Sequence, residues 1–393
     1  MTRRAQILVI VVFLTVITMP MLLFVVGVRP ENTDNRALTP LPELRADNAL
    51  RLEAYELITG YLTDRLPLRD RAIRADSQIE DAITLTDPIS SDLPRGSNGW
   101  LYLATTLADE CPGPPPDAFL RRVDPLAADA DAAGMPLLFV VPPDKESVYP
   151  EHLPVEGLAG LLDLDRPDLP ECERLWREAV DDAAVERPWL IPLVSAVDSA
   201  SNDPDDPVFW KTDTHWTDRG AAFQAAAVLE ALSPGTWTAD EIRPDGTRVK
   251  GQTDLSVLRG LPEREEVPGY LPVRDGVTTT TSVHGAGRDD PRHTVVVTES
   301  TTTGAPLVPG TTVMVGDSFG NHGLPMIQPY FERFVFVPWQ MVAEDDLASA
   351  LEVAGLAPTD VDNLVVQQVQ RNLSEGRYES FIDQLRAFVR SVG

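Results

Sequence analysis

The stretch Thr312-Val313-Met314-Val315-Gly316-Asp317-Ser318-Phe319 decides the fold that we expect. It begins as an apolar run of strand length, and the run ends at a glycine that is soon followed by a serine. A small residue at the turn lets the serine hydroxyl project from the end of a strand, where open α/β sheets usually carry their chemistry. We therefore predict that Ser318 is a nucleophile at the carboxyl end of a strand in an α/β sheet.

A second stretch, Lys211-Thr212-Asp213-Thr214-His215-Trp216, offers such a serine its partners. A carboxylate close to an imidazole fixes the imidazole tautomer and stabilises the imidazolium. We therefore predict a catalytic triad of Ser318, His215 and Asp213. Each half is ambiguous alone, because Gly-Asp-Ser also forms turns and helix caps, and Asp-x-His also forms surface hydrogen bonds or half of a metal site. The occurrence of both halves in one chain favours the triad.

The segments around these two stretches alternate between strand and helix patterns. The run from Met135 to Val141 is apolar throughout, which is typical of a strand buried on both faces of a parallel sheet. The alternation predicts an α/β fold with a parallel sheet flanked by helices. The polar loop 142–150 follows the first strand, so we expect it at the same edge of the sheet as the active site. The later elements of this pattern are helices at 171–184, 219–232, 345–354 and 378–392 and strands at 189–193, 334–337 and 363–369.

Residues 233–309 interrupt the alternation. They are rich in glycine, proline and threonine, and the segments 277–283 and 293–300 have the pattern of paired strands around a turn. We interpret 233–309 as a β-rich insertion that walls one side of the cleft. The insertion belongs to a catalytic domain of residues 44–393, which a proline-broken linker at 30–43 separates from the N-terminal segment.

The first 29 residues have the properties of a membrane anchor. No charge interrupts the segment from Ile7 to Val28, and a helix that spans a bilayer needs about 20 residues. Arg3 and Arg4 precede this segment, which predicts a cytoplasmic N-terminus and an extracytoplasmic catalytic domain. We prefer a single-pass anchor at 1–29 to a cleaved signal peptide, because the apolar core is too long and no Ala-x-Ala-like site follows.

Charge and cysteine content narrow the class of protein further. The 393-residue chain has a formal net charge of -28, which argues against nonspecific binding to nucleic acid or to an anionic membrane surface. The chain has two cysteines, Cys111 and Cys172, and outside the cytoplasm one disulfide can join them. The alternative is two unrelated thiols. Without a Cys-x-x-Cys spacing a metal site is not expected, and we predict neither a metal nor a cofactor.

Five pieces of the chain resemble the AlgJ/AlgX-like branch of the SGNH hydrolase superfamily, whose members are periplasmic or surface proteins of polysaccharide O-acetylation. In that family the Asp-x-His pair precedes the serine, as it does here, and ordinary SGNH hydrolases have the reverse order. The resemblance implies that Ser318 carries the acyl group, that His215 is the general base and acid, and that Asp213 orients it. In chain order the five pieces are Tyr61 to Arg69, Gly99-Trp100-Leu101-Tyr102, Val141 to Pro150, Lys211 to Trp216 and Gly316-Asp317-Ser318-Phe319.

The chain departs from the family pattern near its C-terminus. It has Gln370-Arg371 where family members often carry a Glu-Arg pair. It also has no recognisable C-terminal carbohydrate-binding module, so it looks more like the shorter AlgJ type.

These observations predict an extracytoplasmic, serine-dependent O-acetyltransferase that acts through an acetyl-serine on a cell-surface or secreted polysaccharide. The resemblance implies a membrane-bound O-acyltransferase as the partner that supplies acetyl groups. Asn321, Trp216 and Lys211 are candidates for binding the oxyanion or the substrate, with a capping role for Asn321 and a salt bridge for Lys211 as alternatives. Two other functions stay open: an extracellular carbohydrate acetyl esterase, and a non-catalytic glycan-binding scaffold of the acetylation machinery.

Overall fold

The computed structural model describes residues 93–154, 168–201, 203–285 and 290–393, together with short pieces of the first 92 residues. The linker that we predicted at 30–43 lies outside the described residues, and so does part of the segment 61–69. No helix within the described residues has both the length and the apolar character that crossing a bilayer requires.

The chain forms two compact units. One comprises residues 1–87 and 251–263, and the other comprises residues 88–250 and 264–393. In the first unit, the short helix α10 (Asp254–Leu258) is followed by Gly260, whose carbonyl accepts a hydrogen bond from Arg74 Nε at 2.9 Å. The second unit contains Asp213, His215 and Ser318, and the rest of this section concerns it.

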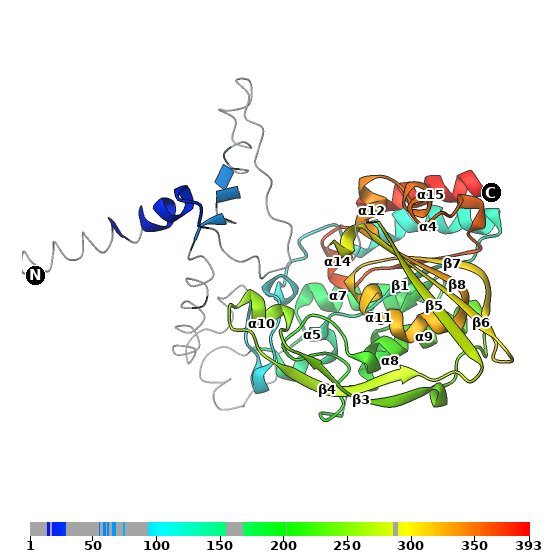
Figure 1. Ribbon diagram of the computed structural model, residues 1–393, viewed down its shortest axis with the longest axis horizontal. Coiled ribbons are helices and arrows are strands. Elements are labelled where there is room, and N and C mark those ends of the chain that lie inside the picture. Colours follow the sequence, from blue (N-terminus) through cyan, green and yellow to red (C-terminus); the bar gives the residue numbers. More distant parts are fainter. Residues whose placement is uncertain are drawn as a thin grey trace, which may run out of the picture. The chain divides into compact units, whose positions relative to one another are not determined.

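A seven-stranded sheet of described residues forms the centre of the second unit (Figure 1). Its strand order is β2-β1-β9-β7-β8-β6-β5. The first five strands in that order run parallel, whereas β6 runs antiparallel to both β8 and β5. In sheet order the bounds are β2 (Leu190–Pro192), β1 (Leu137–Val141), β9 (Asn363–Gln367), β7 (Val308–Gly316), β8 (Phe331–Pro338), β6 (Thr294–Thr302) and β5 (Val277–Gly285).

The sheet is therefore mixed, and our prediction of a parallel sheet was wrong at its last two strands. Only a short segment, 286–293, separates β5 from β6, whereas parallel neighbours need a crossover of a dozen or more residues. The segment 233–309 thus contributes strands to the main sheet itself. Its other two strands, β3 (Ile242–Lys250) and β4 (Glu265–Pro272), pair with each other as a separate antiparallel ribbon.

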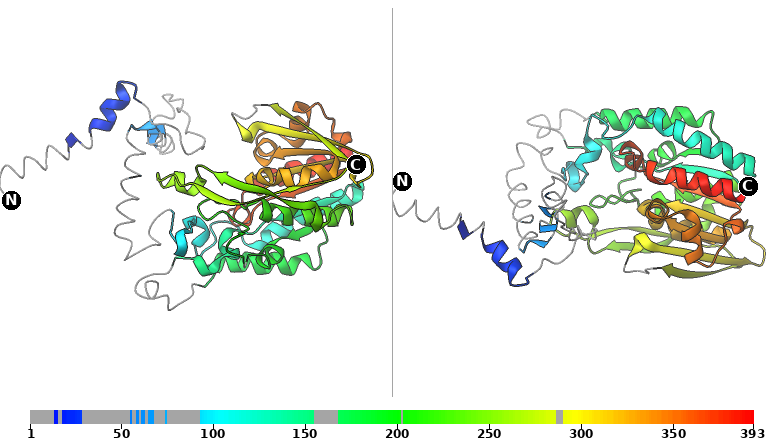
Figure 2. Two further views of the ribbon diagram at one scale, coloured as in Figure 1. Left: turned by 60° about the horizontal axis from the view of Figure 1, so that its bottom comes forward. Right: turned by 90° about the horizontal axis from the view of Figure 1, so that it is seen from above.

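Both faces of the sheet are covered by helices (Figures 1 and 2). Successive residues of β1 point to opposite faces, so Phe139 packs in the core on one side and Leu138 in the core on the other. All five residues of β1 are buried, which confirms the prediction of a strand buried on both faces. One face carries α4 (Pro116–Ala133), α7 (Glu171–Ala184), α12 (Trp339–Glu344), α13 (Leu347–Val353) and α15 (Glu379–Val392); the other carries α8 (Val194–Asp198), α9 (Asp218–Leu232) and α11 (Ser318–Ile327).

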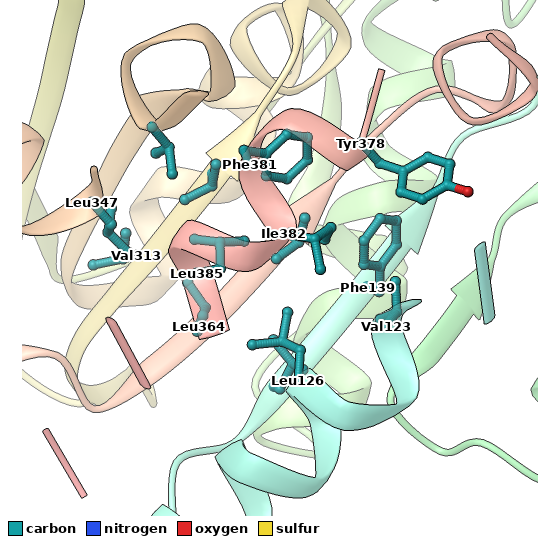
Figure 3. Packing of buried hydrophobic residues seen from close by; sticks show 14 of the residues in the cluster. Val123, Leu126, Phe139, Val313, Leu347, Leu364, Tyr378, Phe381, Ile382 and Leu385 are labelled. Atoms are coloured by element: carbon teal, nitrogen blue, oxygen red, sulfur yellow. The ribbon is translucent and has the colours of Figure 1, made fainter. Parts of the chain in front are cut away.

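The helix α15 shows how the sequence directs this packing. Its strongly one-sided apolar pattern places Phe381, Ile382 and Leu385 against the strands, beside Phe139 and Leu364 (Figure 3). On the same face, the cysteines at 111 and 172 are joined by a disulfide that ties the segment before α4 to α7. With both faces covered, the carboxyl ends of the parallel strands are where the second unit can carry a site.

Candidate active site

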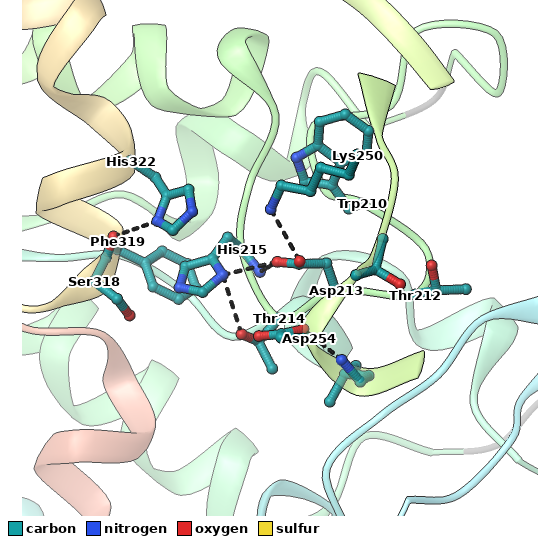
Figure 4. A network of polar contacts seen from close by, with 12 residues as sticks. Trp210, Thr212, Asp213, Thr214, His215, Lys250, Asp254, Ser318, Phe319 and His322 are labelled. Carbon is teal, nitrogen blue, oxygen red and sulfur yellow. Dashed lines mark hydrogen bonds and ion pairs between the residues drawn. The ribbon is translucent and has the colours of Figure 1, made fainter. Parts of the chain in front are cut away.

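The Asp213 carboxylate and the His215 imidazole form a close pair. Asp213 Oδ1 lies 2.7 Å from His215 Nδ1 and also accepts the His215 backbone N–H at 3.0 Å (Figure 4). An ionised carboxylate only accepts, so Nδ1 carries the proton and the lone pair of the neutral ring lies on Nε2. The side chains of His215 and Asp213 are only 11% and 5% exposed. The ring therefore has the tautomer that a general base requires.

Lys250 is a second partner of the same carboxylate. Its Nζ lies 2.9 Å from Asp213 Oδ2 and 5.1 Å from the ring centre of Trp210. Burial alone raises the pKa of Asp213, but the hydrogen bond and charge of His215, followed by Lys250, lower that pKa well below its ordinary value. Asp213 is therefore ionised throughout the neutral range. Sequence reasoning missed Lys250, because it comes from the last residue of β3 and no motif connects it to Asp213.

Two ionic groups, one buried and one half-buried, hold the loop that carries this pair. Lys145 Nζ donates to the backbone carbonyls of Trp210, Lys211 and Asp213 at 3.4, 3.0 and 3.0 Å. The half-buried Glu265 carboxylate accepts the backbone N–H groups of residues 211 and 212 at 2.7 and 3.0 Å. Lys145 belongs to the short helix α5 (Lys145–Val148) in the loop after β1, so that loop lies at the active-site edge, as we predicted.

Ser318 is the first residue of α11 and follows the carboxyl end of β7. It is exposed, whereas its neighbours Asp317 and Phe319 are buried. Asp317 is the N-cap of the helix, since its Oδ1 accepts the Phe319 N–H at 2.9 Å. The other carboxylate oxygen of Asp317 accepts from Val369 N at 2.8 Å and from Asn372 Nδ2 at 2.9 Å. The cap thus attaches the start of α11 to the segment after β9.

Two glycines let α11 lie directly on the sheet. A methyl group at Gly316 would come within 2.9 Å of both Gln367 Oε1 and Phe336 Cε2, and one at Gly320 would come within 2.6 and 3.0 Å of the same two atoms. Gln367 Oε1 also accepts the Asp317 N–H at 3.2 Å. These contacts leave no room for a side chain between the helix and the strands below it.

His322 lies one helical turn after Ser318 and joins the two halves of the site. Its ring stacks on the His215 ring with 3.9 Å between the ring centroids, and its Nδ1 lies 2.7 Å from the Ser318 carbonyl oxygen (Figure 4). The sequence motifs do not point to this histidine, although a spacing of four residues places it on the same helix face as Ser318.

The structure thus brings Asp213 and His215 together and places the start of α11 beside them. No hydrogen bond joins Ser318 Oγ to His215 in the part of the chain that the structure describes, and Figure 4 shows none. The Phe319 ring lies 5.2 Å from the His215 ring, centroid to centroid, so two side chains of α11 contact the imidazole.

The remaining predicted site residues have different surroundings. Trp216 is 1% exposed and packs edge-on against Phe319 at 5.1 Å, so its predicted contact with a sugar is wrong: an apolar ring this deep is part of the core. Lys211 has a half-buried side chain, and Asn321 is exposed on α11, where the capping role belongs to Asp317. Substrate contacts of Lys211 and Asn321 stay predictions.

A cluster of largely buried ionic side chains contacts the start of α11 through Arg371. Arg371 makes an ion pair with Asp144 and lies over the Phe319 ring, 5.1 Å from its centroid. Gln370, where the family often has glutamate, donates from its side chain to the Glu173 backbone carbonyl at 3.1 Å.

Two carboxyl groups near Asp144 have raised pKa values. Burial, followed by the charge of Asp144, raises the pKa of Glu146 to about 7. Burial likewise raises the pKa of Glu173 well above its ordinary value.

An α/β sheet with an Asp–His pair and a helix-capped serine at its carboxyl edge defines an SGNH hydrolase-like protein. The family model described as SGNH hydrolase-like domain, acetyltransferase AlgX, matches residues 93–321. That match spans more than half of the chain and includes Asp213, His215 and Ser318. The chain therefore belongs to this family, which confirms the resemblance seen in the sequence.

Several solved structures are similar to this chain at low identity. A DHHW family protein from Eubacterium siraeum is 13% identical over 73% of this chain and 93% of that chain, with a TM-score of 0.49. The O-acetyltransferase domain of Pseudomonas putida AlgJ is 16% identical over 75% and 98%, with a TM-score of 0.44. Pseudomonas aeruginosa AlgX is 15% identical over 77% and 67%, with a TM-score of 0.45. No curated protein sequence matches the chain.

Proposed function

We propose that this protein is an O-acetyltransferase that moves an acetyl group onto a polysaccharide through an acetyl ester of Ser318. The observation that carries the proposal is the Asp213–His215 pair, ordered by hydrogen bonds, beside the helix that begins with the exposed Ser318. The chain belongs to a family whose description names an acetyltransferase, and this supports acetyl transfer as the class of reaction.

In the first step, Ser318 Oγ attacks the carbonyl carbon of an acetyl donor while His215 Nε2 takes the hydroxyl proton. The tetrahedral intermediate carries its negative charge on the former carbonyl oxygen. The N-terminal end of α11 has a partial positive charge, and the Ser318 N–H lies at this end, so it is the natural donor to that oxyanion. The intermediate collapses when the donor's leaving group departs with the proton from His215.

In the second step, a sugar hydroxyl attacks the acetyl-serine and gives its proton to His215. The second intermediate releases the acetylated sugar, and the proton returns to Ser318 Oγ. Asp213 keeps the imidazole oriented and stabilises its positive charge in both steps. With water as the acceptor, the same residues would perform an esterase reaction, so the identity of the acceptor decides between the two activities.

An extracytoplasmic location agrees with two features of the chain. Disulfides persist mainly in oxidising compartments, and Cys111 is joined to Cys172. The uncharged segment from Ile7 to Val28, preceded by Arg3 and Arg4, is the proposed single-pass anchor. A domain outside the cytoplasm has no direct access to acetyl-CoA, so we propose that a membrane-bound O-acyltransferase relays the acetyl group to it.

The test compares full-length wild-type protein with Ser318→Ala for acetyl release from an activated acetyl ester, with and without neutral oligosaccharides. Mass spectrometry of the intact protein follows the acetyl-enzyme. The matched control is Ser380→Ala, which removes an exposed serine near the start of α15. We expect wild type and the control to release acetyl and to form an acetyl adduct, whereas Ser318→Ala does neither.

The products separate the alternatives. Acetylated oligosaccharide supports transfer, and free acetate that is unaffected by any oligosaccharide supports an esterase. Equal behaviour of wild type and Ser318→Ala would remove the serine mechanism and favour a glycan-binding scaffold.

A further inference from the structure

His322 is held against the face of the His215 imidazole. The two rings are inclined by only 24° with their centroids 3.9 Å apart, which is a stacked arrangement. Both rings lie between the start of α11 and the loop that carries Asp213 (Figure 4). Because His322 belongs to α11, its ring limits how far the His215 ring can tilt toward that helix.

The hydrogen bond of His322 fixes its own tautomer. A backbone carbonyl can only accept, so the 2.7 Å contact between His322 Nδ1 and the Ser318 oxygen requires a proton on Nδ1. Desolvation, followed by the charges of His215 and Lys250, lowers the pKa of His322, while the Ser318 carbonyl and Asp213 oppose this change. The residue as a whole is exposed, but the lowered pKa favours an uncharged ring at neutral pH, and the hydrogen bond to the Ser318 carbonyl holds that ring in one orientation.

The helix α11 thus provides three groups to one site: Ser318 itself, the Phe319 ring 5.2 Å from the imidazole centroid, and the stacked His322. Asp213 fixes the in-plane orientation of His215 through Nδ1, and the two rings of α11 restrict its out-of-plane movement. These ring contacts add to the hydrogen bonds of Lys145 on the Asp213 loop and of Asp317 at the start of α11, which also set the spacing between base and nucleophile.

We propose that His322 is a positioning residue for the acyl transfer. Its stacked ring keeps the His215 imidazole at the distance and orientation from which it can take the Ser318 proton, and it places no second positive charge beside that imidazole. This inference rests on the proposed function, because the alignment matters only if Ser318 and His215 act together. The charge of residue 322 matters because His215 becomes an imidazolium in both intermediates. Lys250 already supplies one positive charge near it. A second cation at 3.9 Å would disfavour proton transfer to His215.

The experiment uses three substitutions at His322 in the full-length protein. His322→Phe keeps an uncharged ring, His322→Met removes the ring without adding charge, and His322→Lys has a similar length to methionine but carries a positive charge. The control is His284→Phe, because His284 lies on β5 and its ring hydrogen-bonds the exposed Ser282 hydroxyl. We measure kcat and KM for acetyl release, the pH–rate profile and the NMR titration of the His215 ring.

We expect the Phe variant to keep a kcat roughly ten times that of the Met variant, with similar KM values. We expect the kcat of the Lys variant to fall below that of the Met variant by about a further tenfold, because a cation beside His215 disfavours its protonation, and we expect His215 to titrate at a lower pH in the Lys variant than in the Met variant. Urea unfolding of each variant identifies any loss of folding, and the His215 titration reports on the site independently of turnover.

Equal kcat values for the Phe and Met variants would overturn the positioning role of the ring. Equal His215 titration midpoints in the Met and Lys variants would overturn the role of neutrality. If wild type itself transfers no acetyl group while the His215 titration still separates Met from Lys, the proposed function fails but the coupling of the two rings stands.

Discussion

Asp213 is the residue on which the proposed base depends most. One of its carboxylate oxygens faces His215 and the other faces Lys250, so its charge is shared between two partners. We predict that Asp213→Asn lowers kcat/KM for acetyl release by roughly a thousandfold or more, because an amide cannot stabilise the imidazolium and favours the wrong tautomer. Steady-state kinetics with the full-length protein measure this effect. Asp205→Asn, at an exposed position of the preceding loop, is the control, and a loss below tenfold for Asp213→Asn would contradict the assignment.

Glu146 makes a separate prediction about pH and stability. Its pKa is raised from 4.5 to about 7, and its Oε1 has no hydrogen-bond partner among the described residues. Between these two pH values the folded state binds more protons at Glu146 than the unfolded state, so its contribution to stability falls as the pH rises. Glutamine keeps the shape and removes the titration. We therefore predict that Glu146→Gln is the more stable protein at about pH 8, by on the order of 1–3 kcal/mol, and that the difference shrinks toward pH 4.5.

Urea unfolding of wild type and Glu146→Gln across this pH range gives the two stability curves. Glu151→Gln, at an exposed neighbouring position, should follow wild type at every pH. Parallel curves for Glu146→Gln and wild type would show that Glu146 does not titrate in this window.

At the scale of elements, the start of α11 is stabilised by more than an ordinary helix cap. Asp317 accepts the Phe319 N–H of its own helix and also two donors from the segment after β9. We predict that Asp317→Ala lowers the free energy of unfolding by about 2–4 kcal/mol, because the cap is lost and buried donors are left without an acceptor. Asp346→Ala is the matched comparison, since Asp346 caps α13 through the Ser349 N–H on the exposed surface and should cost about 1 kcal/mol. Similar losses in urea unfolding would refute the bracing role of Asp317.

Local sequence patterns were sufficient for the elements that are buried and continuous. The apolar run in β1 and the run that ends at Ser318 both form inner strands, since such runs are stable only with both faces covered. Asp213 and His215 meet because they are two residues apart. Lys250 reaches Asp213 only through the pairing of β3 with β4, and no local pattern encodes that contact. Trp216 was misjudged because proximity in sequence to the base does not determine on which side of the loop a ring packs.

For the whole molecule, the disulfide between Cys111 and Cys172 closes a loop with a sequence separation of 61. We predict that replacing both cysteines with alanine lowers the free energy of unfolding by about 2–4 kcal/mol, because the unfolded chain regains freedom that the link removes. Thermal unfolding with and without reductant measures this loss. Reductant should lower the Tm of wild type and leave the double variant unchanged; equal sensitivity of the two proteins would contradict the prediction.

The close contact of α11 with the sheet also has a consequence for how such proteins diverge. Gly316 and Gly320 meet the same two side chains, Gln367 and Phe336, on two other strands. An alanine at either glycine would lift the helix and carry its first residue away from the imidazole, unless one of the two larger side chains became smaller at the same time. Among homologues, these four positions are therefore expected to covary as one unit, and a large residue at 316 or 320 would mark a lineage that has lost the reaction.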